Sequence, residues 1–127
     1  MNLPNLNAVR DLARRWASSG GKNPEAWAEL EELTAQDPDR AFRTIEEIHH
    51  LLTSTEPRDV EAWGLLAAGP LEMLLVRHGA EVIGSAEELA RSDVEFRKLL
   101  GGVWKSDMED DVHARIQKIS DPTYKFI

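Results

Sequence analysis

The sequence has no cysteine, no glycine-rich phosphate loop, and no Gly-x-Ser-x-Gly or His-Glu-x-x-His motif. Without cysteine, disulfides, thiolate nucleophiles and thiolate-bound metals are excluded. The longest nearly apolar run, Leu65 to Leu71, is far shorter than the ~20 residues that cross a bilayer. The segment Met1 to Asn5 lacks the basic and apolar regions of a signal peptide. These absences predict a cytoplasmic protein, and we expect no enzyme activity, no cofactor and no metal site.

Positive charge is also scarce. Lysine and arginine number 15 against 23 aspartates and glutamates, which gives a net charge of −8 and a pI of about 5.0. Nucleic acids and anionic membranes bind proteins largely by releasing counterions to positive side chains, so neither is an expected partner. Residues 1–22 carry four basic and one acidic side chains, whereas residues 23–76 carry three basic and twelve acidic.

Apolar residues recur at the three- and four-residue spacing of amphipathic helices, and no segment alternates as a strand would. Short connections between helices favour antiparallel packing. We therefore predict an all-α fold, a single domain over residues 1–127, built as a compact bundle of about seven or eight short helices. Gly84 weakens one of these helices by ~1 kcal/mol relative to alanine. The four tryptophans fall on or beside the apolar stripes and are predicted to lie in the core: Trp16, Trp27, Trp63 and Trp104.

Helix starts are indicated where a capping side chain precedes the first turn, often together with proline. These signals are Asn23-Pro24, Asp37-Pro38, Thr55-Glu56-Pro57, Ser92-Asp93 and the capping-box pattern Ser106-Asp107-Met108-Glu109. Two stretches resemble each other, Pro24 to Leu52 and Pro57 to His78. Each begins with proline, has a tryptophan within two turns and meets a second proline 13 or 14 residues later. A helical-pair repeat of HEAT-like character and an irregular bundle both fit this similarity.

The segment from Ala67 to Gly79 has the clearest signals for helix ends and starts. Gly69 suits the left-handed position after a helix, and Pro70 suits the first position of the next helix. Glu72 is predicted to cover the free N–H groups of that new helix, and Gly79 to end it. The sequence therefore predicts a structural corner made by these four residues.

The same segment carries a family resemblance. The residues Ala67-Ala68-Gly69-Pro70-Leu71-Glu72, with Leu74-Leu75 and His78-Gly79, resemble the signature of a bacterial, all-helical domain family of unknown function. A second run is similar to the same family: Phe96-Arg97, Leu100-Gly101-Gly102-Val103-Trp104 and Asp110-Asp111-Val112. The resemblance covers roughly residues 60 to 119 and implies a small, helical, bacterial protein. The resemblance identifies no catalytic residues. Glu109 departs from the family pattern, which has proline at this position.

Two groups of residues could form a catalytic or metal site. Glu72 and His78 are six residues apart, so they do not share a helix face, and no nucleophile accompanies them. The acidic cluster Asp107 to Asp111 lacks the glycine and the bidentate glutamate of a calcium-binding loop. We interpret Glu72 as a capping side chain, His78 as a partner of helix-end carbonyls, and the cluster as complementary to a helix dipole.

Glu46, His49 and His50 form a single Glu-x-x-His pair. Di-iron bundles need that motif twice, together with further inward glutamates. We therefore interpret these residues as solvated side chains in local contact on one helix.

The acidic residues offer the one indication of a partner. Glu25, Glu29 and Glu32 share a face of the second predicted helix, and Glu46 and Glu47 lie on the next. Such charges usually maintain solubility, but they can also steer a basic protein toward its binding site. We expect these five residues to form a partner-binding acidic face.

Three functions remain open at this point. The first is a non-catalytic, helical protein-interaction module, concretely an immunity or antitoxin-like protein that binds and blocks a basic toxin or effector. The second is a small enzyme or metal-dependent hydrolase that uses Glu72 and His78, or the Asp107–Asp111 cluster. The third is a helical-repeat structural adaptor.

Overall fold

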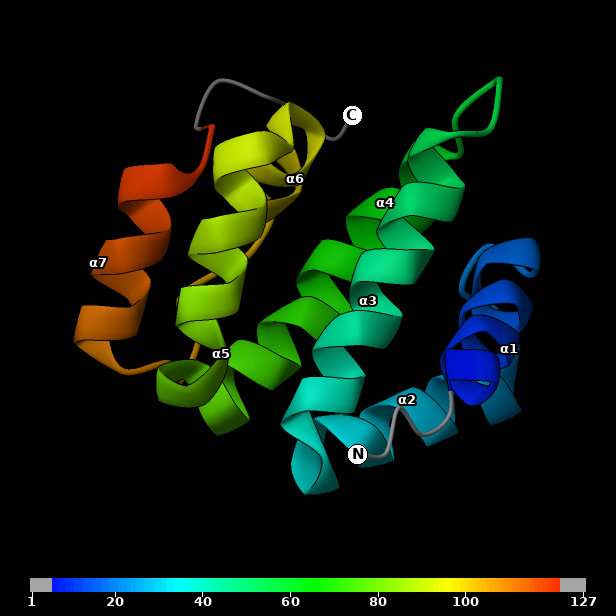
Figure 1. Cartoon of the computed structure of the whole chain (residues 1–127), viewed down its shortest axis with the longest axis horizontal. Helices are drawn as coiled ribbons and strands as arrows, with labels where there is room; N and C mark the ends of the chain where they lie inside the picture. The colour runs from blue at the N-terminus through cyan, green and yellow to red at the C-terminus, as the bar shows by residue number, and fades with distance from the viewer. Residues whose placement is uncertain (1–5, 122–127) are drawn as a thin grey trace.

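The chain is all-α, as the sequence predicts. The computed structural model describes residues 6–121; the ends of the predicted domain, residues 1–5 and 122–127, lie outside the described residues. Between residues 6 and 121 there are seven α-helices, one π-helical turn and no strand (Figure 1). In chain order the elements are α1 (Leu6–Ser18), α2 (Pro24–Gln36), α3 (Pro38–Thr53), α4 (Val60–Leu66), η1 (Ala67–Leu71), α5 (Glu72–Ser92), α6 (Val94–Leu100) and α7 (Asp110–Ile119).

Capping side chains begin three of the helices where the sequence indicates. The Asn23 side-chain oxygen accepts hydrogen bonds from two N–H groups in the first turn of α2, at 3.0 and 3.1 Å. Asp37 accepts one such bond at the start of α3, at 3.2 Å, and Asp93 accepts one at the start of α6, at 3.0 Å. These bonds satisfy N–H groups that have no partner within their own helix.

Two other predicted starts are misplaced. Asp59, not the Glu56-Pro57 pair, caps α4, by accepting a 3.0 Å hydrogen bond from an N–H group in the first turn. The capping box before α7 does not form, because Glu109 occupies the cap position without a side-chain bond. Ser106 has a φ of 48°, so the chain is still turning where the helix was expected to begin.

The predicted corner at Gly69-Pro70 is wrong, because the helix continues through it. α4 runs through η1 into α5 as one rod, which descends behind α3 in Figure 1. Within the described chain, glycines with positive φ are found at positions 20 and 21, and Gly69 is not among them. Gly69 is needed for a different reason. A Cβ there would lie 2.7 Å from the Cη2 atom of Trp27, so its absence lets this ring of α2 pack directly on the rod.

The π-helical turn explains how proline fits inside the rod. Pro70 has no N–H group to donate and would interrupt a regular α-helical ladder. The N–H of Glu72 donates a hydrogen bond to the carbonyl of Ala67, five residues earlier, so the helical hydrogen bonding continues on the far side of the proline. Because Pro70 and Leu71 are both buried, continuing the helix keeps them in the core.

α5 bends sharply at His78, whose φ of −139° and ψ of 37° are not helical. The predicted helix end at His78-Gly79 therefore corresponds to a kink that divides α5 into two segments, and not to a loop. Gly79 is buried, and a Cβ there would lie 2.9 Å from Cγ1 of Val112. Its role is to let α7 approach α5 closely, which replaces the predicted role of ending a helix.

The core confirms the predicted location of most, but not all, of the tryptophans. Trp16 and Trp63 are fully buried, and the half-buried Trp27 stacks on Trp16 with ring centroids 5.8 Å apart. Trp104 is 76 % exposed, so its predicted place in the core is wrong. It lies between α6 and α7, in a segment that forms no helix.

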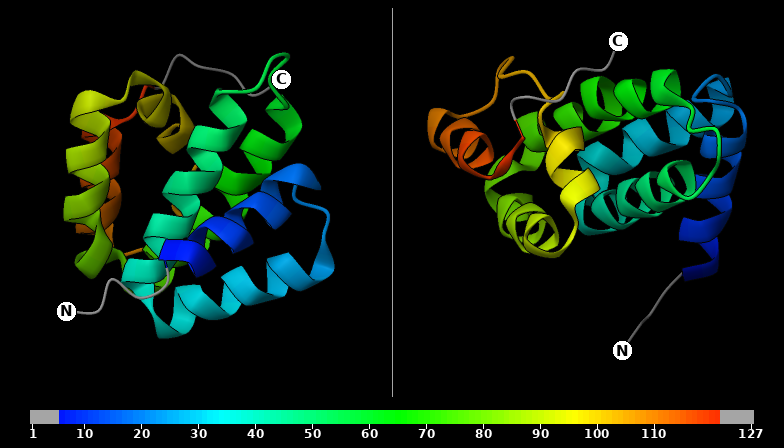
Figure 2. Two further views of the ribbon diagram at one scale, coloured as in Figure 1. Left: turned by 45° about the vertical axis from the view of Figure 1, so that its right-hand side comes forward. Right: turned by 90° about the horizontal axis from the view of Figure 1, so that it is seen from above.

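The helices are arranged on two sides of α3. In both views of Figure 2 and in Figure 1, α1 and α2 lie on one side, and the second segment of α5 lies with α6 and α7 on the other. Pro24 to Leu52 forms two separate helices, whereas α4, η1 and the first segment of α5 form a single rod. The two stretches are therefore not copies of one helical pair, and the irregular bundle describes the fold. No helix in residues 6–121 has the length and apolar character to cross a membrane.

Candidate functional site

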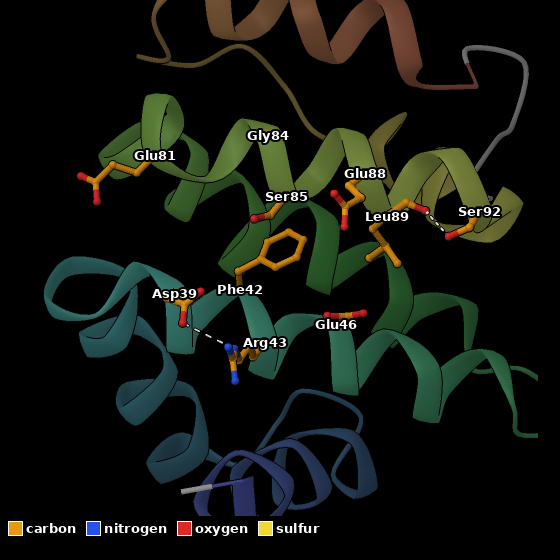
Figure 3. Close-up of a pocket in the computed structure, with 10 residues that line it drawn as sticks. All are labelled: Asp39, Phe42, Arg43, Glu46, Glu81, Gly84, Ser85, Glu88, Leu89 and Ser92. Carbon is orange, nitrogen blue, oxygen red and sulfur yellow. Dashed lines mark hydrogen bonds and ion pairs between the residues drawn. The ribbon is translucent and has the colours of Figure 1, made fainter. Parts of the chain in front are cut away.

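A groove of about 680 Å³ lies between α3 and the second segment of α5 (Figure 3). The side chains that line it come from positions three and four residues apart on each helix, which places them on facing sides. They are Asp39, Phe42, Arg43 and Glu46 from α3, and Glu81, Gly84, Ser85, Glu88, Leu89 and Ser92 from α5. The groove has the size of a ligand- or peptide-binding site.

The charges along the groove are mostly negative. Four carboxylates line it, two from each helix, against one guanidinium. That guanidinium, on Arg43, lies 3.4 Å from the Asp39 carboxylate and is therefore already paired. Glu46 and Glu88 have no cationic side chain within 4.0 Å among the described residues. The groove thus presents unpaired negative charge from both of its walls.

Apolar and small residues lie between these charges. Figure 3 shows Phe42 pointing from α3 toward α5, and Ser85 and Leu89 pointing back from α5. Phe42 is held from behind by Phe96, whose ring meets it edge-on at 6.2 Å. The groove therefore has a fixed apolar floor with acidic edges.

The five predicted partner-binding glutamates do not form one face. Glu25, Glu29 and Glu32 are exposed on α2, whereas Glu46 and Glu47 are half-buried on α3. Glu29 and Glu32 line a separate hollow between α1, α2 and α3, and Glu46 lines the α3–α5 groove.

Glu29 is already engaged within the chain. The Arg15 guanidinium donates to both of its carboxylate oxygens, at 2.7 and 3.1 Å, and this bidentate pair lowers the pKa of Glu29 below its ordinary value. The same pairing, with a second contact to Asp11, raises the pKa of Arg15. The α2 face is therefore partly neutralised by a cation of α1. In the α3–α5 groove, Asp39 and Glu81 lie beside Arg43 and His78, whereas Glu46 and Glu88 have no such partner among the described residues.

Glu72 and His78 have different partners. Glu72 accepts a 2.9 Å hydrogen bond from the backbone N–H of Trp104, so it fastens the loop before α7. The prediction that Glu72 covers the free N–H groups of its own helix is wrong. α5 continues directly from η1, so its first turn has no free N–H groups to cover. His78 does meet a helix-end carbonyl, but that of Ala35 in α2, at 3.0 Å, and its other ring nitrogen lies 3.0 Å from Glu81.

His78 and its neighbour Arg77 together close the C-terminal end of α2. Arg77 donates to the carbonyl of Glu31 at 3.1 Å and to the hydroxyl of Thr34 at 2.9 Å. Hydrogen bonds to the Ala35 carbonyl and then to Glu81 raise the pKa of His78 above its ordinary value. Arg77, and His78 when it is protonated, thus stabilise the negative end of the α2 dipole.

His49 is fully buried, which corrects the prediction that it is solvated. Its Nδ1 accepts a 3.1 Å hydrogen bond from the indole N–H of Trp63, so Nε2 carries the proton and donates to Asp93 at 3.1 Å. Burial lowers the pKa of His49, against the attraction of Asp93. Burial would raise the pKa of Asp93, but its hydrogen bonds from Phe96 and His49 hold it below its ordinary value. This network fixes α6 to α3 and α4.

The cluster from Asp107 to Asp111 lies on the surface. Asp107, Asp110 and Asp111 are exposed, and Asp110 pairs with Lys105 at 3.0 Å. In residues 6–121 no three histidine, aspartate or glutamate side chains are arranged to hold a metal ion.

Glu81, Ser85 and Glu88 line the groove but are not among the site residues predicted from the sequence. Their spacing of three and four residues was a readable signal for one common helix face. What no local pattern shows is that this face lies opposite Phe42 and Glu46 of α3.

A family model described as "Family of unknown function (DUF6869)" matches residues 16–123. The matched region includes both segments that carry the resemblance, from Ala67 to Gly79 and from Phe96 to Val112. No curated protein and no solved structure matches the chain.

Proposed function

Because the chain belongs to the DUF6869 family, whose description assigns no activity, we propose a role from its own geometry. The protein is a non-catalytic, helical interaction module that binds a positively charged protein in the α3–α5 groove. The observation that carries this proposal is the groove's charge. Of its four carboxylates, Asp39 lies beside the one guanidinium and Glu81 beside His78, while Glu46 and Glu88 have no cationic partner within 4.0 Å among the described residues.

A basic protein fits this groove better than other classes of ligand. Nucleic acid binding depends on positive side chains, and the one in the groove, Arg43, is paired with Asp39. The half-buried Leu89, beside the buried Phe42, offers apolar area that a protein side chain can cover, and the acidic edges speed the approach of a basic partner. Among protein partners, one with a complementary basic surface is therefore favoured.

The concrete version that we propose is a bacterial immunity or antitoxin-like protein of the cytoplasm, which occludes the functional surface of a basic toxin or effector. The net charge of −8 supports it, because an acidic inhibitor associates rapidly with a basic target. A toxin encoded beside the gene, and formation of a tight 1:1 complex with it, are the expected observations.

Two charge-reversed variants of the protein, used beside wild type to capture the partner, test where the partner binds. The groove variant is Glu46→Lys with Glu88→Lys, and the matched control is Glu25→Lys with Glu32→Lys on α2, which changes the net charge by the same amount. We expect wild type and control to retain a basic protein from the host. The groove variant should bind the purified protein with roughly tenfold slower association, and wild-type binding should weaken as salt is added.

The reverse pattern would contradict the proposed site. If the α2 variant loses the partner while the groove variant retains it, the binding surface is the α2 face. Equal affinity of all three proteins for a purified partner would remove electrostatic recognition altogether.

A further inference from the structure

Gly84 is a glycine that nothing within the described fold requires. It lies in the second segment of α5, with helical backbone angles, and is exposed to solvent. A Cβ built there meets no atom within 4 Å, in contrast to Gly69 and Gly79, where the same atom would collide with Trp27 and Val112. Glycine is the poorest helix former after proline, so its presence in an exposed helix weakens α5 without a packing benefit.

The position of Gly84 connects it with the groove. It lines the α5 wall, beside Ser85, one turn from Glu81 on one side and from Glu88 on the other (Figure 3). At this point the wall has almost no side chain, while charged side chains lie a turn away in both directions. Two helices approach closely only where the side chains between them are small. The wall is therefore shaped for close approach of another backbone.

On the basis of the proposed function, we propose that the groove binds an α-helix of the basic partner, which packs along α5 and comes closest to it at Gly84. The α5 residues that line the groove run from position 81 to 92, about 16 Å of helix at 1.5 Å per residue. The bound helix is therefore about three turns long. Its basic residues meet Glu46 and Glu88, and its apolar residues meet Leu89 above the buried Phe42.

A helix suits this groove better than an extended segment. An extended peptide gains affinity by adding to an exposed sheet edge, and both walls here are helices whose backbone groups are already paired. A helix satisfies its own backbone and needs only side-chain contacts from the groove. A second copy of this chain is disfavoured, because its net charge of −8 would repel the acidic edges.

Three synthetic peptides separate helical recognition from charge alone. The first is an amphipathic lysine–leucine helix of about 18 residues, or five turns. The second replaces lysine with glutamate, and the third keeps the lysines but carries two central prolines that prevent a helix. Fluorescence anisotropy measures their binding to wild type, to Gly84→Leu, to Glu46→Gln with Glu88→Gln, and to Ala114→Leu. Ala114 is exposed on α7, away from the groove, so its variant places the same leucine side chain elsewhere on the surface.

We expect the basic helix to bind wild type and Ala114→Leu alike, and to gain helical circular dichroism on binding. Gly84→Leu should bind it at least tenfold more weakly while melting no lower than wild type, which excludes misfolding as the cause. The acidic peptide should not bind. Because leucine favours helices more than glycine does, reduced binding by an equally stable variant indicates a blocked contact.

The outcomes that contradict the inference are distinct from those that contradict the proposed function. If the proline peptide binds as tightly as the basic helix, or Gly84→Leu binds normally, the helical occupant is wrong and the basic-partner function stands. If neither lysine peptide binds wild type, or both bind the double glutamine variant equally well, the proposed function itself fails.

Discussion

At the scale of single residues, Gly69 and Gly84 show two opposite environments for the same amino acid. Both have helical backbones, but Gly69 faces a Trp27 ring that is itself stacked on Trp16, whereas Gly84 faces open space. The sequence predicts a helix end at Gly69-Pro70, because glycine often takes a positive φ after a helix. Glycine can also allow a neighbouring side chain to pack closely, and the sequence alone does not distinguish the two roles. Because Pro70 and Leu71 are both buried, the continuous rod is favoured over a turn at this point.

Alanine substitutions at these two glycines should therefore have opposite effects. We expect Gly69→Ala to lower the free energy of unfolding by about 1–3 kcal/mol, because crowding against Trp27 outweighs the better helix propensity. Gly84→Ala should raise it by up to about 1 kcal/mol. Urea denaturation measures both changes, and Gly69→Ala in a Trp27→Leu background should lose most of its penalty. Changes of the same sign at both sites would contradict the packing described for Gly69.

At the scale of elements, features set by local hydrogen bonds could be predicted from the sequence, and features set by long-range contacts could not. The starts of α2, α3 and α6 were predictable, because Asn23, Asp37 and Asp93 bond to N–H groups only a few residues away. The course of the chain between α6 and α7 was not. It depends on Glu72, which bonds the N–H of a residue 32 positions later and so holds the exposed Trp104 in place.

Removing the Glu72 carboxylate should release this loop. In Glu72→Ala we expect the amide hydrogen of Trp104 to exchange at least tenfold faster than in wild type, because its hydrogen-bond acceptor is gone. Glu72→Gln keeps an acceptor oxygen and should exchange at an intermediate rate. Glu109→Ala, which removes an exposed glutamate without this bond, is the matched control. Unchanged exchange in Glu72→Ala would show that other contacts hold the loop.

At the scale of the whole molecule, two histidines make stability depend on pH in opposite directions. His49 is buried and neutral, and its pKa in the folded state lies below the ordinary value of 6.5. The unfolded chain then binds more protons, so this contribution to stability is present above pH 6.5 and is lost as the pH falls. His78 has a raised pKa, so its contribution is present below pH 6.5 and is lost as the pH rises through the folded value.

Urea denaturation between about pH 5 and pH 8 separates these two contributions. We expect the destabilisation by His49→Gln to be largest at pH 8 and to shrink toward pH 5. The destabilisation by His78→Gln should be largest at pH 5 and shrink toward pH 8. Two penalties that change with pH in the same direction would show that one of the two hydrogen-bond networks is assigned wrongly.

The candidate site also belongs to the whole molecule, and this is why the sequence could predict only part of it. The acidic character of residues 23–76 and the candidate Glu46 were readable from composition and spacing. The pairing of α3 with the second segment of α5 was not, because it follows from the kink at His78 and from the packing of the α4–α5 rod. The sequence therefore grouped Glu46 with the α2 glutamates, and the fold places it opposite Glu88.

Mapping a basic ligand on the protein by nuclear magnetic resonance tests the central claim most directly. In a titration of the ¹⁵N-labelled protein with the lysine–leucine helix, the α3–α5 groove predicts that amide shifts change most at positions 39–46 and 81–92. Gly84 should be among the most affected amides. Positions 25–32 on α2 should change little. Shift changes centred on α2, with positions 81–92 unaffected, would contradict the assignment of the binding site to the groove.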